Sequence, residues 1–179
     1  MEAQQLIKLA RGSIAEEFGE KFDLESFATS ELKDEGASFV TITQNGELRG
    51  CIGSLIATSP LYRDIAHNAK SAAFKDPRFR PLSKEEFEDI KIEVSVLTPP
   101  KELEYSDIED LKSKIIPNKH GVILTNGYNK ATFLPQVWEQ LPTFDLFFAH
   151  LCQKSGQSLN CLEAHPTIQT YEALKYKEE

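Results

Sequence analysis

The strongest constraint on the fold is a stretch of alternating, β-branched sequence interrupted by an Asn-Gly pair. Residues 37–43 alternate between apolar and polar side chains, a pattern typical of a strand with one buried face. Asn45 and Gly46 follow, and both central residues of a type I′ hairpin turn need a positive φ. The chain then returns through residues 48–55. The sequence therefore predicts an antiparallel hairpin over residues 37–55.

Apolar spacing and breaker residues predict the remaining elements. Helices are expected at 3–18, 60–75, 83–90, 106–113, 135–140 and 143–156, and further strands at 91–98, 122–125, 130–134 and 167–176. Because hairpins rather than β-α-β units join the clearest strand pairs, we predict an α+β fold. Its sheet would be mostly antiparallel with flanking helices. We expect one domain over residues 1–179. If it divides into a larger body and a smaller subdomain, Pro99-Pro100 is the only plausible boundary in the sequence.

Composition excludes several function classes. The 179 residues carry a net charge of −8, which argues against coating nucleic acid or binding anionic membranes. No apolar run is long enough for a transmembrane span, and the N-terminus lacks a signal-peptide pattern. The three cysteines are odd in number and form no C-x-x-C pair, so we expect reduced thiols in a cytoplasmic protein.

The predicted return strand carries the least ordinary chemistry. Gly50 and Gly53 flank Cys51 although glycine weakens strands, and their lack of a side chain lets a ligand or another backbone approach. Alternation places Arg49 on the same face as Cys51, where a guanidinium would favour a reactive thiolate. Arg49, Gly50, Gly53 and Ser54 are therefore predicted to bind a ligand or partner, with Cys51 as a candidate nucleophile. The alternative is a small buried cysteine under a β-bulge, with Arg49 paired to a carboxylate.

Two turns supply further candidates. In residues 76–81, Asp76, Arg78 and Phe79 could form an anion-binding or partner-docking turn, or a self-contained turn whose aromatic ring fills the core. Lys119 and His120 precede a strand, so Lys119 could bind a ligand and His120 could act as an acid or base. The alternative for His120 is an exposed residue without a role.

The sequence does not favour a zinc site. His150, Cys152, Cys161 and His165 offer suitable ligand types, but Cys152 falls on the apolar stripe of its helix and His150 lies about 200° around it. The sequence contains no nucleotide-binding, hydrolase or metalloprotease motif. We therefore predict neither a metal nor a cofactor.

Seven blocks in order make the chain resemble the AMMECR-one domain family, also called AmmeMemoRadiSam system protein A. They are residues 36–41, 48–53 (LRGCIG), 76–81, 92–97, 119–122, 134–138 and 154–156. The chain departs from the family pattern at Arg80, Asn118 and Ser155, where the family usually has proline, glycine and alanine. The resemblance implies an α/β fold with two subdomains, an activity that is not established, and association with Memo-like and radical-SAM proteins. A regulatory role is also implied.

Three hypotheses for the function follow. The first is an intracellular accessory or regulatory protein that binds a small ligand or partner protein through the LRGCIG strand. The second is a thiol-dependent enzyme in which Cys51 is the nucleophile, Arg49 activates it and His120 is the base. The third, regulation through nucleic acid, is weakened by the negative charge. The oligomeric state is left open.

Overall fold

The hairpin expected from the Asn-Gly pair is present in the computed structural model, which describes all 179 residues. It joins β2 (Ser38–Gln44) to β3 (Glu47–Gly53), and Asn45 and Gly46 both have positive φ, 53° and 81°. The chain divides into two compact units, Met1–Leu97 with Leu174–Glu179 and Thr98–Ala173. We call these the first and the second unit.

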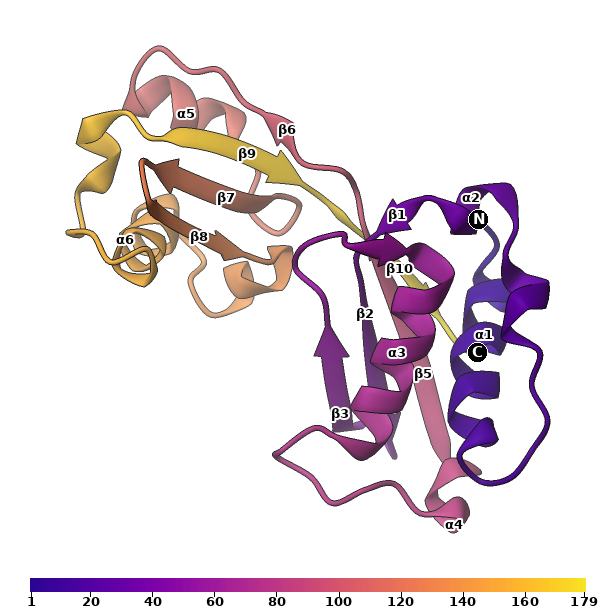
Figure 1. Cartoon of the computed structure of the whole chain (residues 1–179). Coiled ribbons are helices and arrows are strands. Elements are labelled where there is room, and N and C mark those ends of the chain that lie inside the picture. Colours follow the sequence, from indigo (N-terminus) through magenta and orange to yellow (C-terminus); the bar gives the residue numbers. More distant parts are fainter. The chain divides into compact units, whose positions relative to one another are not determined.

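The first unit is a four-stranded sheet with helices on one face. The strand order is β10 (Ala173–Lys177), β5 (Ile90–Leu97), β2 and β3, so β3 is an edge strand. α1 (Ala3–Glu16) packs against β5, and α3 (Leu61–Phe74) packs against β2 and β3 (Figure 1). Alternate residues of the sheet and the apolar stripes of both helices form one buried core. Smaller elements complete the unit: α2 (Ser30–Lys33), β1 (Glu35–Gly36), β4 (Ser59–Pro60), α4 (Lys84–Phe87) and a 3₁₀ turn at Leu24–Phe27.

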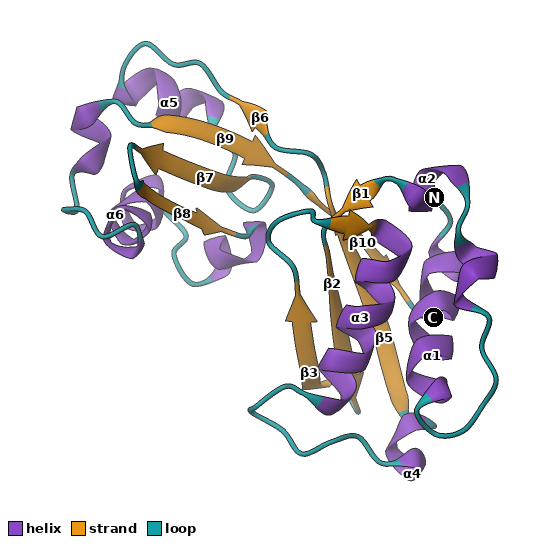
Figure 2. Cartoon of the chain, in the orientation of Figure 1, coloured by secondary structure: helices purple, strands orange, loops and turns teal.

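The second unit has its own sheet and its own core. The strand order is β6, β9, β7, β8, and helices and 3₁₀ turns accompany it (Figure 2). The only tryptophan, Trp138, stacks on Phe147 in this core, with ring centroids 3.7 Å apart. None of the helices in either unit is both long and apolar enough to cross a bilayer. The elements are β6 (Lys101–Glu102), α5 (Ile108–Lys114), β7 (Gly121–Asn126), β8 (Asn129–Phe133), α6 (Phe144–Lys154), β9 (Thr167–Tyr171) and 3₁₀ turns at Pro135–Glu139 and Cys161–Ala164.

The α+β class is confirmed, but the single strand expected at 167–176 is wrong. This stretch forms two strands that belong to different sheets, β9 in the second unit and β10 beside β5 in the first. The break falls at Glu172, whose backbone N–H donates to Thr98 Oγ1 at 2.8 Å instead of to a neighbouring strand. Both strands have the same two-residue period, so periodicity alone could not separate them.

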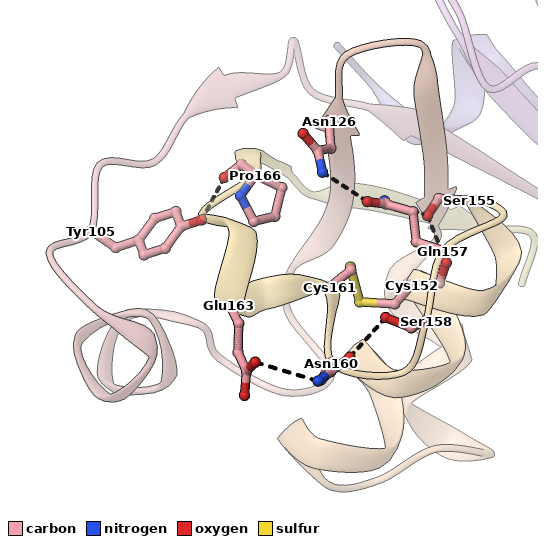
Figure 3. Close-up of a disulfide and its surroundings, with 10 residues drawn as sticks. All are labelled: Tyr105, Asn126, Cys152, Ser155, Gln157, Ser158, Asn160, Cys161, Glu163 and Pro166. Carbon is pink, nitrogen blue, oxygen red and sulfur yellow. Dashed lines mark hydrogen bonds between the residues drawn. A yellow bond between two sulfur atoms is a disulfide. The ribbon is translucent and has the colours of Figure 1, made fainter.

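The expectation of three reduced cysteines is also wrong. Cys152 of α6 and Cys161 of the following 3₁₀ turn form a disulfide, with Cα atoms 5.7 Å apart (Figure 3). Gly156, at φ 85°, ends α6 and lets the chain turn back toward the helix. The odd count was misleading because Cys51 is the one left over. The bond also occupies both thiols among the four candidate zinc ligands.

Candidate functional site

A β-bulge in β3 defines the start of the candidate site. Ile42 pairs with Gly50 and Thr43 with Leu48, so Arg49 is an extra residue without a partner on β2. A bulge bends the strand and redirects the side chain that it contains. The alternation expected for Arg49 and Cys51 is therefore interrupted, and the guanidinium donates its hydrogen bonds to Glu86 and to the carbonyl of Arg80.

The two glycines of β3 are needed for contacts within the first unit. A Cβ on Gly50 would lie 2.1 Å from the backbone carbonyl oxygen of Ala72, so α3 packs directly on the strand. A Cβ on Gly53 would lie 2.2 Å from the ring of Phe39. The close approach that the glycines permit is thus made by the protein's own backbone and side chains.

Cys51 lies on the sheet face opposite α3 and is half-buried. Its Sγ atom lies 3.3 Å from Oγ1 of Thr41, its cross-strand neighbour. Its backbone N–H points away from β2 and donates to Oδ2 of Asp76 at 3.0 Å. Arg78 shares Oδ2 of Asp76 with this N–H, so its guanidinium is the cation that the hydrogen bonds bring near Cys51. The role assigned to Arg49 as activator of this thiol is therefore not supported by the geometry.

Asp76 fixes the turn that follows α3 to the free edge of β3. Its buried carboxylate accepts from the backbone of Cys51 and Arg78, and from the guanidinium of Arg78 at 2.7 and 3.1 Å. Arg78 is the main cause that holds the pKa of Asp76 well below its usual range, and the Cys51 N–H acts in the same direction, whereas burial opposes both. Asp76 is therefore a charged structural anchor at neutral pH.

A second buried ion pair holds the other end of this turn. Arg49 and Glu86 meet at 2.8 Å, with side chains 10% and 12% exposed. Glu86 also accepts from the N–H of Ser83 and so completes a capping box at the start of α4. Arg49 is the main cause that lowers the pKa of Glu86 to about 2, against the effect of burial. Nη1 of Arg49 is buried without a hydrogen-bond partner.

Phe79 lies between two guanidinium groups. The Cζ atoms of Arg49 and Arg78 are 5.7 and 5.5 Å from its ring centroid. These distances fall within the range of cation–π contacts. Phe79 is half-buried, whereas the side chains of Arg78 and Arg80 are 54% and 80% exposed. The turn thus presents an aromatic ring and two cations from a fixed base.

Sequence reasoning missed Asp64, Asn68 and Glu86. Ser54 donates to Oδ1 of Asp64 at 2.7 Å, and Asn68 donates to Ser54 and Asp64, so the end of β3 is tied to α3. The buried Asp64 carboxylate also accepts from the backbone and hydroxyl of Ser38. The sequence pattern that could have identified Asp64 and Asn68 is their spacing of four positions beside the alanine stripe of α3, which indicates a buried polar pair.

His120 and Lys119 lie in the second unit, just before β7, whereas Cys51 lies in the first. Nδ1 of His120 accepts from the backbone N–H of Ile116 at 3.0 Å, and burial, followed by the charge of Lys119, lowers the pKa of His120, although Glu172 opposes this. The structure therefore brings Arg49, Cys51, Asp76, Arg78 and Phe79 together and provides no geometry for a Cys51–His120 pair.

Comparisons with known proteins agree on one family. The AMMECR1 family model matches residues 7–176. The protein LS215_2104 of Saccharolobus islandicus is 38% identical, with 97% of this chain and 80% of that protein covered. Protein MK0488 of Methanopyrus kandleri is 39% identical over 87% of this chain and 77% of its own length. The crystal structure of the uncharacterised protein PH0010 from Pyrococcus horikoshii has a TM-score of 0.77 at 32% identity, covering 97% and 90% of the two chains.

Proposed function

The chain belongs to the AMMECR1 family, and from this premise we propose that it is an accessory protein that binds an acidic, extended segment of a partner protein. The binding surface would be the outer edge of β3 at residues 52–53, beyond the contact of Cys51 with Asp76, together with Arg78, Phe79 and Arg80. We call this surface the β3 platform. Under this proposal the LRGCIG strand binds the partner and catalyses no reaction.

The observation that carries the proposal is the way in which buried carboxylates fix an exposed cationic turn. Asp76 and Glu86 hold the turn at its two ends, so that Arg78 and Arg80 project from a rigid base. A preorganised surface loses little conformational entropy on binding. Around the turn, the guanidiniums of Arg49, Arg78 and Arg80 outnumber the two carboxylates, which favours an acidic partner although the whole chain is at −8.

The edge position of β3 supports an extended partner segment. The N–H of Cys51 points away from β2 but already donates to Asp76, so it is not available to a partner. Residues two apart on a strand point the same way, so the backbone of Gly53 also faces this outer edge, beyond the Asp76 contact. An extended peptide can add to such an edge through main-chain hydrogen bonds. Acidic side chains on that peptide would meet Arg78 and Arg80.

The resemblance names two partners to test, a Memo-like protein and a radical-SAM protein from the same organism. We propose a cytoplasmic location for this complex. The disulfide is an exception to the reduced thiols that are expected in most cytosols.

The test measures the affinity of the full chain for each purified partner by isothermal titration calorimetry. Arg78→Glu/Arg80→Glu should weaken binding by about tenfold or more, because two attractive charges become repulsive. Lys33→Glu/Lys130→Glu makes the same change in net charge at two exposed lysines outside the platform and should change the affinity by less than about twofold. Equal affinity of both double variants, or no complex of the wild type with either partner, contradicts the proposal.

A thiol-dependent enzyme is the second candidate, because Cys51 is free and half-buried and its backbone shares the Asp76 carboxylate with Arg78. Iodoacetamide labelling without reductant reports Cys51 alone, since the disulfide protects the other two cysteines. Under the binding proposal, labelling is slow until the protein unfolds, and Cys51→Ser keeps its partner affinity. Rapid labelling of the folded protein below about pH 7 would favour the enzyme instead.

A further inference from the structure

We propose that a small polar pocket in the second unit binds a free α-amino acid with a short side chain. The pocket has a volume of about 210 Å³, and all of its lining residues belong to the second unit. Pockets for drug-sized ligands measure about 300–1,000 Å³, so this one suits a smaller metabolite. It is independent of the β3 platform. Its polar lining consists of Thr98, Lys101, His120, Thr170 and Glu172, and we call it the His120 pocket.

Strand pairing brings this polar lining together. Lys101 of β6 lies opposite Thr170 of β9. The register between β9 and β7, extended by one residue, places His120 opposite Glu172 just beyond the ends of both strands. Two hydrogen bonds of 2.8 Å, one in each direction, fix the backbone of Glu172 to Thr98. Three separate segments of the chain therefore supply one pocket.

His120 has one ring nitrogen free for a ligand. Its Nδ1 accepts from the backbone N–H of Ile116 at 3.0 Å, and its carbonyl accepts from Nε1 of Trp138 at 2.8 Å, so the residue is held on two sides. The ring is neutral at pH 7, because burial is the main cause that lowers its pKa. A nitrogen that accepts from an N–H carries no proton, so the proton lies on Nε2. Nε2 has no partner within the protein and can donate to a ligand carboxylate.

The charged groups of the lining are one cation and one anion, and neither is neutralised within the protein. Lys101 is exposed and Glu172 is half-buried, and their side chains form no salt bridge or hydrogen bond with each other or with another residue. A simple anion would be repelled by Glu172 and a simple cation by Lys101, whereas a zwitterion can pair with both. An α-amino acid offers a carboxylate to Lys101 and His120, and an ammonium group to Glu172.

The first experiment titrates the full chain with L-alanine and follows ¹H–¹⁵N chemical shifts together with the ring protons of His120. We expect saturable shifts at His120, Gly121 and Thr170, with a Kd of about 1 mM or less. L-Lactate replaces the ammonium group by a hydroxyl, and isopropylamine replaces the carboxylate by a methyl group. Each should bind at least about tenfold more weakly, because one charge of the pocket then has no counterpart in the ligand. Equal binding of either analogue, the absence of saturable shifts, or shifts confined to other residues overturns the proposal.

Two variants assign the two ends of the ligand. Glu172→Gln should weaken L-alanine binding by about tenfold or more and remove the preference for L-alanine over L-lactate. Lys101→Gln should weaken L-alanine binding by a similar factor and keep that preference. The contacts between Glu172 and Thr98 use the backbone of Glu172, so the substitution leaves them in place.

The control variant is Lys130→Gln/Glu139→Gln, which removes one charge of each sign at exposed residues of the second unit outside the pocket. Its affinity for L-alanine should stay within about twofold of the wild type. Thermal unfolding establishes that each variant is folded. Unchanged affinity in both pocket variants, or an equal loss in the control, contradicts the proposal.

Discussion

At the scale of single residues, the charged side chains around β3 form ion pairs with one another. Asp76 and Glu86 are each held in the ionised form by an arginine, and each carboxylate in turn fixes the orientation of its arginine side chain. Removing one partner of a buried ion pair is costly, because the other charge stays buried and unpaired. The stability of the first unit should therefore depend on these carboxylates.

Glu86→Gln tests this dependence. At pH 7 we expect the free energy of unfolding of the first unit to fall by about 3 kcal/mol, since Arg49 loses its buried partner. This loss of unfolding free energy is measured by unfolding in urea, with hydrogen exchange of the β3 amides as the readout. The Trp138 fluorescence transition reports the second unit and should not change, which provides an internal control.

The pH dependence of this difference has a definite sign. The pKa of Glu86 is lowered to about 2 from an ordinary 4.5, so its stabilising effect is complete above about pH 5 and is lost as the pH falls through 2. The wild type should therefore approach the Glu86→Gln variant in stability as the solution is acidified over this interval. A difference that is the same at pH 7 and pH 2.5 would show that the ion pair does not stabilise the fold.

At the scale of elements, the contact of α3 with β3 decides the geometry of the candidate site. Gly50 lets the backbones meet, and Asp64 and Asn68 tie the end of the strand to the same helix. The bulge at Arg49 then directs the guanidinium toward α4. The position of Cys51 relative to Asp76 and Arg78 follows from this packing.

Gly50→Ala should destabilise the first unit by about 2–3 kcal/mol, because the new methyl group meets a backbone oxygen that cannot move aside. Gly53→Ala is the matched control in the same strand. Its methyl group meets the base of the half-buried Phe39 ring, which is a side chain that can move aside by changing its χ1 angle, so we expect a smaller loss of about 1–2 kcal/mol. Chemical denaturation ranks the two variants, and the reverse order would contradict the packing argument.

The disulfide should stabilise the second unit. Its two cysteines are nine residues apart, and closing a loop of this length contributes about 2–3 kcal/mol. Cys152→Ala/Cys161→Ala should therefore lower the midpoint of the Trp138 fluorescence transition, and reduction of the wild type should have a similar effect. Cys51→Ser leaves the disulfide intact and should leave this midpoint unchanged.

At the scale of the whole molecule, the C-terminal segment returns to the first unit. Glu178 accepts from Arg11 and from the backbone N–H of Ile92, and its own N–H donates to the carbonyl of Ile92. Residues at the two ends of the sequence thus complete one sheet and one ion pair. The first unit is therefore discontinuous in sequence, whereas the second is a single insertion from Thr98 to Ala173.

Truncation after Ala173 should selectively weaken the first unit. It removes β10 and leaves Arg11 without its carboxylate, and we expect a loss of about 3 kcal/mol or more. Hydrogen exchange at Ile92 and Val94 should become faster, while the Trp138 transition stays in place. Unchanged protection of β5 would mean that β10 contributes nothing to this sheet.

The sequence by itself determined the hairpin over residues 37–55, most helices and the α+β class. These depend on local rules: turn chemistry at Asn45-Gly46, two-residue alternation and helical apolar spacing. It also singled out Arg49, Cys51, Asp76, Arg78 and Phe79. Glycines are unusual within a strand, and the two prolines that flank Arg78 and Phe79 prevent a helix there. Their roles in binding or catalysis remain predictions.

Only the tertiary structure decided which of these residues meet. The pairing of Arg49 with Glu86, the pairing of Cys152 with Cys161 and the division of residues 167–176 between two sheets join parts of the chain that no local pattern relates. The physical reason is that ion pairs, disulfides and strand pairing depend on distance in space. Periodicity reports only which face of its own element a residue occupies.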